Sequence, residues 1–193
     1  MKSKRDIRVI PKAKGPMPVF MEHARKRRWL LEKAIAHPPK SKESGEVVYR
    51  DPASQTIITL RDDALAGFRF FIVSGSQQTE IADELRALVP SYADSELLEW
   101  WDNAVDSNDI DDKVDAVLYL GTGAPPEPRT DVSDRLLAAL DDEDDDVRNA
   151  AIVGAGFTDW ADVFRAQLNA MAKKDANATA RSRARVVLDR WGK

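Results

Sequence analysis

The 193-residue sequence predicts a mainly α protein, in which a short α-solenoid of about three helix pairs follows a basic helix and a small antiparallel β-hairpin or meander. Apolar residues recur at helical spacing through the second half of the chain, and similar helical segments recur every 35 residues. Runs of β-branched and aromatic residues are confined to residues 46–73. We expect a basic flexible arm over 1–18, a helix plus a small β unit over 19–75, and helical repeats over 76–193.

The N-terminal part begins with a segment rich in Lys, Arg and Pro that shows no hydrophobic period, which is typical of an arm that is disordered unless a partner or the domain holds it. A helix is predicted from about Pro18, because residues at helical spacing, most of them apolar, then share one stripe, and Pro38–Pro39 ends the helix. The stripe consists of Phe20, Ala24, Arg27, Leu31 and Ala34.

Three short runs favour strands, namely Glu46–Arg50, Gln55–Leu60 and Phe68–Val73. Asp51–Ser54 suits a four-residue hairpin loop between the first two runs. Phe68–Val73 is also compatible with the start of a buried helix.

From Ser76 onward each segment has the i, i+3/i+4, i+7 pattern of an amphipathic helix. The first predicted helix begins near Thr79 and is stopped by Pro90. The others are predicted at Asp94–Val105, Asp111–Leu120, Thr130–Leu140, Asp146–Gly154, Trp160–Ala172 and Ala178–Trp191.

Two of these helices align at an offset of 35 residues, and a further 35 residues leads to Arg183, Val186 and Val187. The aligned pairs are Asp111 with Asp146, Lys113 with Arg148, Ala116 with Ala151, Val117 with Ile152, and Gly121 with Gly156. The stretch LLAALDDEDDDVRNAAIVGAG resembles a HEAT-type repeat of the short variety found in phycobiliprotein-lyase-like proteins. Its D-x-V-R-x-A-A positions are Asp145, Val147, Arg148, Ala150 and Ala151.

The resemblance covers about residues 92–193 and implies a HEAT-like solenoid in which Asp and Arg residues form an inter-repeat ladder of charge pairs. The ladder positions here are Lys113, Asp146, Arg148 and Arg183. Arg148 is expected to pair with Asp111 or with Asp146. The third repeat lacks the Asp and the double Ala, and such repeats indicate an architecture rather than an activity.

Composition excludes several classes of chemistry. The chain has no cysteine, which rules out disulfides, thiolate metal sites and thiol catalysis. No apolar run is long enough to cross a membrane, and a signal-peptide core is not seen at the start, so we expect a cytoplasmic protein with no membrane partner. We expect no metal and no cofactor: a two-histidine metal site would need both His23 and His37. Neither histidine has a Ser or Cys in a recognisable nucleophile setting, which argues against a role in catalysis.

The net charge of −4 conceals a strong segregation of charge. Residues 1–42 carry 13 Lys/Arg against 3 Asp/Glu, a net +10, and residues 43–89 carry a net −4. Residues 90–147 carry 3 basic against 18 acidic side chains, a net −15, and residues 148–193 carry a net +5. Such a distribution controls association with charged partners.

Six consecutive acids at a turn, Asp141–Asp146, are the strongest candidate for a binding surface. Capping of the following helix by Asp145 and Asp146 explains only part of this charge. We expect the partner-binding acids to be Asp141, Asp142, Glu143, Asp144, Glu99, Asp102 and Asp106.

Asp106–Ile110 begins like a calcium loop, but Ile110 replaces an oxygen ligand and Asp111 replaces the glycine of the turn.

A basic patch, Arg25, Lys26, Arg27 and Arg28, is the second candidate, because clustered Lys and Arg bind phosphates. The alternative is a solvated charged helix face. Among the tryptophans, Trp101, Trp160 and Trp191 fit the core, whereas Trp100 either packs on the N-terminal unit or is an exposed anchor for a partner.

These features predict a non-catalytic protein-binding module whose acidic solenoid surface engages a basic protein partner. One concrete form is a bacterial immunity or antitoxin protein that occupies the nucleic-acid cleft of a toxic nuclease. The alternative is a nucleic-acid-binding HEAT-like protein that uses the basic arm and helix. A lyase or isomerase is a third class implied by the resemblance, for which the sequence offers no catalytic residue.

Overall fold

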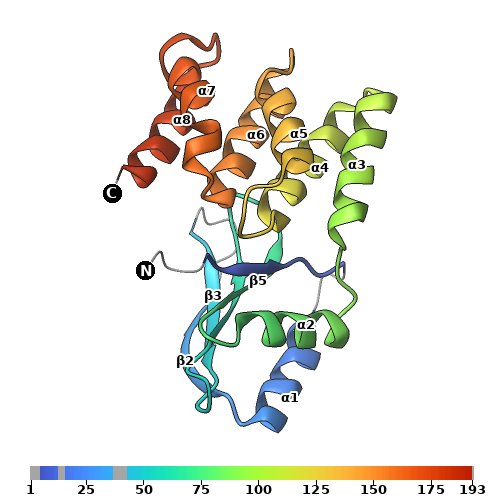
Figure 1. The fold of residues 1–193 in the computed structure, drawn as a ribbon, viewed down its shortest axis with the longest axis vertical. Coiled ribbons are helices and arrows are strands. Elements are labelled where there is room, and N and C mark those ends of the chain that lie inside the picture. The colour runs from blue at the N-terminus through green and yellow to red at the C-terminus, as the bar shows by residue number, and fades with distance from the viewer. Residues whose placement is uncertain (1–4, 13–15, 37–42, 193) are drawn as a thin grey trace. The chain divides into compact units, whose positions relative to one another are not determined.

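The computed structural model describes residues 5–12, 16–36 and 43–192, which form five strands and eight helices in two compact units, Met1–Tyr92 and Ala93–Lys193. The expectation of a mainly α protein with a small hairpin or meander is wrong, because a five-stranded antiparallel sheet makes the fold mixed α/β (Figure 1). The first unit contains β1 (Ile7–Val9), α1 (Met17–Arg27), β2 (Leu30–Ile35), β3 (Gly45–Arg50), β4 (Ile57–Asp62), β5 (Arg69–Ser74) and α2 (Gln78–Leu88).

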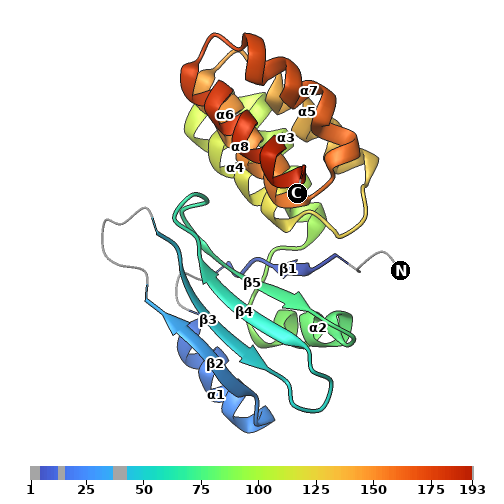
Figure 2. The same cartoon turned by 90° about the vertical axis from the view of Figure 1, so that its left-hand side faces the viewer.

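The sheet has the strand order β1-β5-β4-β3-β2, and every neighbouring pair is antiparallel. Helices α1 and α2 cover one face of it (Figures 1 and 2). Alternate residues of the strands point to that face and pack on the helices, since side chains alternate along a strand. The core between them includes Phe20 and Ala24 of α1, Ile81 and Leu85 of α2, and Tyr49, Ile58, Leu60, Phe71 and Val73 of the sheet.

The predicted helix from Pro18 through Ala34 is wrong in its second half. Helix α1 ends at Arg27, where Arg28 adopts a left-handed conformation with φ of 56°. Trp29 then enters the core, and the chain continues as β2, which pairs with β3. The predicted stop at Pro38–Pro39 and the residue His37 lie outside the described residues.

Residues 5–12 are not a flexible arm. Strand β1 pairs with β5, placing Val9 opposite Phe71, and the Gln78 side chain donates a hydrogen bond to the carbonyl of Arg5. Val9 and Ile10 are each 2% exposed. Burial of these apolar side chains holds the segment on the unit, which a sequence without periodicity does not reveal.

The second unit contains α3 (Asp94–Ser107), α4 (Ile110–Gly123), α5 (Thr130–Leu140), α6 (Asp145–Thr158), α7 (Ala161–Lys174) and α8 (Ala178–Trp191). Each odd-numbered helix packs on the even-numbered helix that follows it. Helices α4, α6 and α8 are successive neighbours in one layer, and α3, α5 and α7 are successive neighbours in the other.

Helices α4 and α6 approach one another closely at two glycines, Gly121 and Gly154. A Cβ placed on Gly121 would lie 2.3 Å from the Cα of Gly154, so only hydrogen at this position permits the approach.

Of the tryptophans, Trp101 and Trp160 are buried as expected, and Trp191 is half-buried. Trp100 donates its indole N–H to Asp112 over 2.7 Å and packs beside Tyr119, a placement within the helical unit that neither predicted alternative contains.

Candidate functional site, an acidic rim on the helical unit

The turns that connect the two helices of each pair share one local design. The residue that caps the second helix is Asp109 in the first pair, Asp144 in the second and Asn177 in the third. Asp109 accepts one backbone N–H of the following turn, and Asp144 and Asn177 accept two each, which satisfies donors that have no intrahelical partner. A basic residue follows four positions later in every case, namely Lys113, Arg148 and Arg181.

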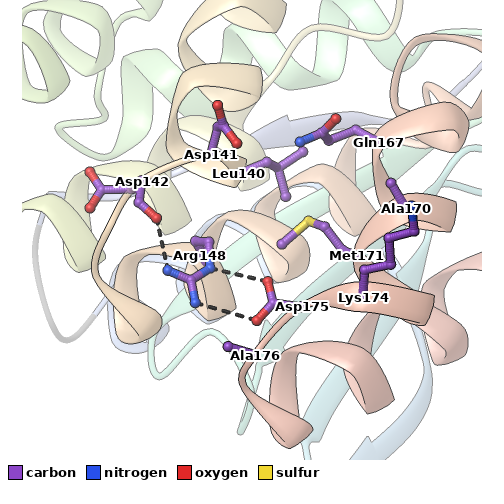
Figure 3. Close-up of a pocket in the computed structure, with 10 residues that line it drawn as sticks. All are labelled: Leu140, Asp141, Asp142, Arg148, Gln167, Ala170, Met171, Lys174, Asp175 and Ala176. Atoms are coloured by element: carbon purple, nitrogen blue, oxygen red, sulfur yellow. Dashed lines mark hydrogen bonds and ion pairs between the residues drawn. The ribbon is translucent and has the colours of Figure 1, made fainter.

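These basic residues connect successive turns. The Arg148 guanidinium donates from Nε to Asp175 of the next turn over 3.1 Å, and to the carbonyls of Asp142 and Glu143 over 2.8 and 2.9 Å (Figure 3). Lys113 Nζ lies 3.4 Å from a carboxylate oxygen of Asp142. Arg181 binds the carbonyls of Asp175 and Ala176 in the same way, and no described carboxylate forms an ion pair with it. The ladder therefore runs from Lys113 to Asp142 and from Arg148 to Asp175.

This arrangement corrects the predicted ladder. Arg148 pairs with Asp175 and with Asp145, not with Asp111 or Asp146. Arg181 takes the place expected for Arg183, because the caps are 35 residues apart between the first two pairs but only 33 between the last two. A constant offset therefore misses the third position.

The six consecutive acids divide into two groups. Three of them are structural. Asp142 accepts the N–H of Asp144 and lies beside Lys113, and Asp144 caps α6. Asp145 binds Arg148 and Asn177. Asp141, Glu143 and Asp146 carry no hydrogen bond or ion pair from their side chains to any described residue. Asp141, Glu143 and Asp146 are all exposed, so they present unneutralised charge to solvent.

We call the acids of the first two turns the acidic rim: Asp106, Asp109, Asp111, Asp112 and Asp141–Asp146. Of the predicted acids on α3, Asp106 lies in the last turn of the helix and belongs to the rim. Glu99 and Asp102 lie earlier on α3, and Asp102 forms a bidentate pair with Arg135 over 2.8 and 2.6 Å. This hydrogen bonding lowers the pKa of Asp102 and commits its charge to the fold.

Asp115, which the sequence does not single out, lies beside the rim and has a shifted pKa. It lies one turn after Asp111 and Asp112 on α4. Burial, followed by the charges of Asp112 and Asp111, raises the pKa of Asp115. Desolvation is the largest cause of this shift, and repulsion by the two carboxylates of the rim adds to it.

A shallow cavity of about 350 Å³ opens between the second and third turns (Figure 3). Leu140 and Met171 supply its apolar lining, Asp141 and Asp142 come from one turn, and Lys174 and Asp175 come from the other. The charge changes sign across it, since Lys173 and Lys174 end α7. The lining contains no Ser, Cys or His nucleophile, and the cavity is suited to holding a side chain by contact and charge.

The basic patch lies in the first unit and is only partly paired. Lys26 pairs with Glu22 and Arg27 pairs with Glu84, which also binds His23 over 2.6 Å. The side chains of Arg25 and Arg28 are exposed and pair with no carboxylate of the described residues.

Within the described ranges, no group of three or more His, Asp or Glu side chains is arranged to hold a metal ion, and no helix is long and apolar enough to cross a membrane. Comparison with known proteins found no matching family model, no matching curated protein and no matching solved structure.

Proposed function

We propose that this protein is a non-catalytic binding module whose acidic rim engages a basic protein partner. The observation that carries the proposal is the set of three exposed carboxylates, Asp141, Glu143 and Asp146, whose side chains form no hydrogen bond or ion pair with the described residues. The helix dipole favours Asp146 in the first turn of α6, but Asp141 and Glu143 lie before that helix, and like charges a few ångströms apart repel one another. A partner that brings Lys or Arg to the rim relieves this repulsion.

One concrete form of the proposal is a bacterial immunity or antitoxin-type inhibitor, in which acidic side chains occupy the phosphate-binding cleft of a nuclease. Electrostatic attraction of this kind raises the association rate, and the rate then falls steeply with salt. We also propose a cytoplasmic location, in keeping with a chain that needs no disulfide. The assignment of residues 92–193 to HEAT-type repeats remains a proposal that rests on the sequence motif.

The test compares two variants that remove the same charge. Asp141→Asn/Glu143→Gln/Asp146→Asn neutralises the free acids and leaves the cap Asp144 and the ladder residue Asp142 in place. Asp134→Asn/Asp162→Asn/Asp189→Asn removes three exposed acids that lie away from these turns. Partners are captured from the native cell with wild type, identified by mass spectrometry, purified, and assayed for association at about 50 and 300 mM salt.

The proposal predicts a basic partner whose association slows at least about tenfold with the rim variant and much less with the control, and whose salt dependence flattens only with the rim variant. Equal rates and equal salt slopes for wild type and the rim variant contradict it.

A second candidate is nucleic-acid binding through the basic patch, which the exposed and unpaired Arg25 and Arg28 favour. Binding of duplex DNA or RNA that weakens with salt, and that Arg25→Gln/Arg28→Gln reduces, supports this candidate. The rim variant, which loses three negative charges, is expected to bind nucleic acid no more weakly than wild type.

A further inference from the structure

The two edges of the sheet in the first unit differ in how they end. At the β1 edge the strand has three residues, and the chain beyond it is held by a bridge between Pro11 and Ser91 and by a hydrogen bond from the N–H of Lys12 to Pro90. At the other edge, no strand among the described residues pairs with the outer side of β2 (Figure 2). An open edge presents unpaired backbone N–H and C=O groups that another strand can use.

Strand β2 is also unusually apolar for an open edge. Leu30, Leu31 and Ile35 are 55%, 57% and 46% exposed, and all six residues of the strand are exposed. Single exposed leucines are ordinary on protein surfaces, but a group of large apolar side chains on an unpaired edge marks an association site.

A β-bulge determines which side chains of β2 share a face. Leu31 and Ala34 stand opposite Tyr49 and Val47, which point to the helix-covered face. Leu30 and Ile35 stand opposite Arg50 and Glu46, which point to the other face. The register shifts between Leu31 and Lys33, so one extra residue is accommodated there.

The bulge places Glu32 and Lys33 on the same face of the sheet. Glu32 binds Arg50 over 2.5 Å and Lys33 binds Glu46 over 2.6 Å, and both partners lie on the face away from the helices. In a regular strand two successive residues point to opposite faces, so a two-fold axis perpendicular to the sheet cannot pass between them. The bulge removes this restriction for Glu32 and Lys33.

We propose that β2 pairs with β2 of a second copy of this chain, antiparallel, about a two-fold axis between Glu32 and Lys33. Residues that share a face then stand opposite one another in every pair. Leu30 faces the second copy's Ile35, and Leu31 faces its Ala34. Glu32 faces the second copy's Lys33 twice, once on each side of the axis. The strand is thus complementary to itself in both apolar contact and charge.

A lysine on an edge strand commonly prevents such pairing, because its charge must be desolvated next to a neighbouring strand. Here Lys33 and Glu32 are already neutralised by Glu46 and Arg50 of the adjacent strand. In the dimer, Lys33 lies between Glu46 of its own chain and Glu32 of the second copy, and Glu32 lies between Arg50 of its own chain and Lys33 of the second copy. This inference does not rest on the acidic rim, which belongs to the other unit.

The first test is sedimentation equilibrium of the full chain from about 10 µM to 1 mM. A pair of six-residue strands buries less than a standard interface, so we expect weak dimers with a dissociation constant on the order of 0.1 mM. Lys33→Glu places carboxylates opposite carboxylates and should weaken the dimer about tenfold or more. Lys26→Glu, the same change at an exposed lysine of α1, should leave it unchanged. A monomer throughout, or a dimer that ignores Lys33→Glu, overturns the proposal.

The second test fixes the register, using the absence of cysteine from the chain. Residues 30 and 35 of one strand are about 16 Å apart, too far for an internal disulfide, whereas opposite residues of antiparallel strands lie within bonding range. Leu30→Cys/Ile35→Cys should therefore oxidise to a covalent dimer that reductant reverses. Leu65→Cys/Val186→Cys, at residues 56% and 67% exposed, should remain mainly monomeric under the same conditions. Equal cross-linking of the two variants overturns the proposed pairing.

Discussion

Removal of the Arg148 side chain should be among the most destabilising single changes in the helical unit. The side chain is 13% exposed, and its partner Asp175 is 5% exposed. Arg148→Ala leaves that carboxylate with the N–H of Asn177, at 2.8 Å, but without its opposite charge. Breaking a buried ion pair by removing one partner costs about 3–5 kcal/mol. Because Asp175 keeps one hydrogen bond and solvent reaches the carbonyls of Asp142 and Glu143, we expect a loss of about 3 kcal/mol.

The measurement is urea unfolding followed by circular dichroism at 222 nm and by tryptophan fluorescence, since four of the five tryptophans lie in the helical unit. Arg148→Lys keeps the charge but loses the planar fork, so it should recover less than half of the loss. In a double-mutant cycle with Asp175→Ala, the coupling energy should be about 2 kcal/mol. A loss below about 1 kcal/mol for Arg148→Ala, or a coupling energy near zero, refutes the ladder as a source of stability.

Three further changes test other parts of the fold. Ile10→Ala should lower the free energy of unfolding by about 2–4 kcal/mol, because Ile10 is 2% exposed. Leu65→Ala, at a residue 56% exposed, should lower it by under about 0.5 kcal/mol. Similar unfolding midpoints for the two variants contradict the assignment of residues 5–12 to the folded unit. Gly121→Ala should lower the free energy of unfolding by about 3 kcal/mol or more, since the new Cβ meets the backbone of Gly154. Gly192→Ala, whose Cβ has only ordinary contacts, should change it by under about 1 kcal/mol. Equal thermal stability of the two variants argues against the close approach of α4 and α6. The raised pKa of Asp115 means that the folded state binds this proton more tightly than the unfolded state, so stability from this group rises as the pH falls through its folded pKa. Asp115→Asn should therefore raise stability at pH 7 by at most about 0.5 kcal/mol, with no gain at pH 3; a gain that is the same at both pH values contradicts this origin.

The sequence predicts elements well where local signals and burial agree. Thr130–Leu140 is confirmed with the predicted bounds, and the runs near Glu46–Arg50 and Phe68–Val73 are confirmed as strands. The prediction for Leu30–Ile35 is wrong because Leu, Glu, Lys and Ala are good helix formers and continue the stripe of α1. Hydrogen bonds to β3 make this segment a strand instead. The strand Ile7–Val9 is missed because three residues are too few to show a hydrophobic period. Its conformation follows from pairing with β5, which is distant in the sequence.

For the candidate site, the sequence locates the acidic residues but does not show what each of them does in the fold. The run Asp141–Asp146 marks the rim, but the sequence alone does not separate the acids that the fold uses from those that it leaves free. The separation follows from hydrogen bonds: Asp144, not Asp145, is the cap, and Asp142 is a ladder residue. A basic residue four positions after each cap was the available signal, and it identifies Arg181, which a constant 35-residue offset does not.

The strand order has a consequence for synthesis on the ribosome. Ile7 stands opposite Val73, so β1 cannot be incorporated into the sheet until β5, the last of the five strands to be made, has left the exit tunnel. During that interval Val9 and Ile10, which are buried in the finished protein, remain exposed on a growing chain. At about 5–20 residues per second, some 65 residues take at least about 3 s to be added, which is long compared with the formation of a hairpin such as β3–β4. The N-terminal segment of the nascent chain is thus available to chaperones throughout the period in which the rest of its unit is made.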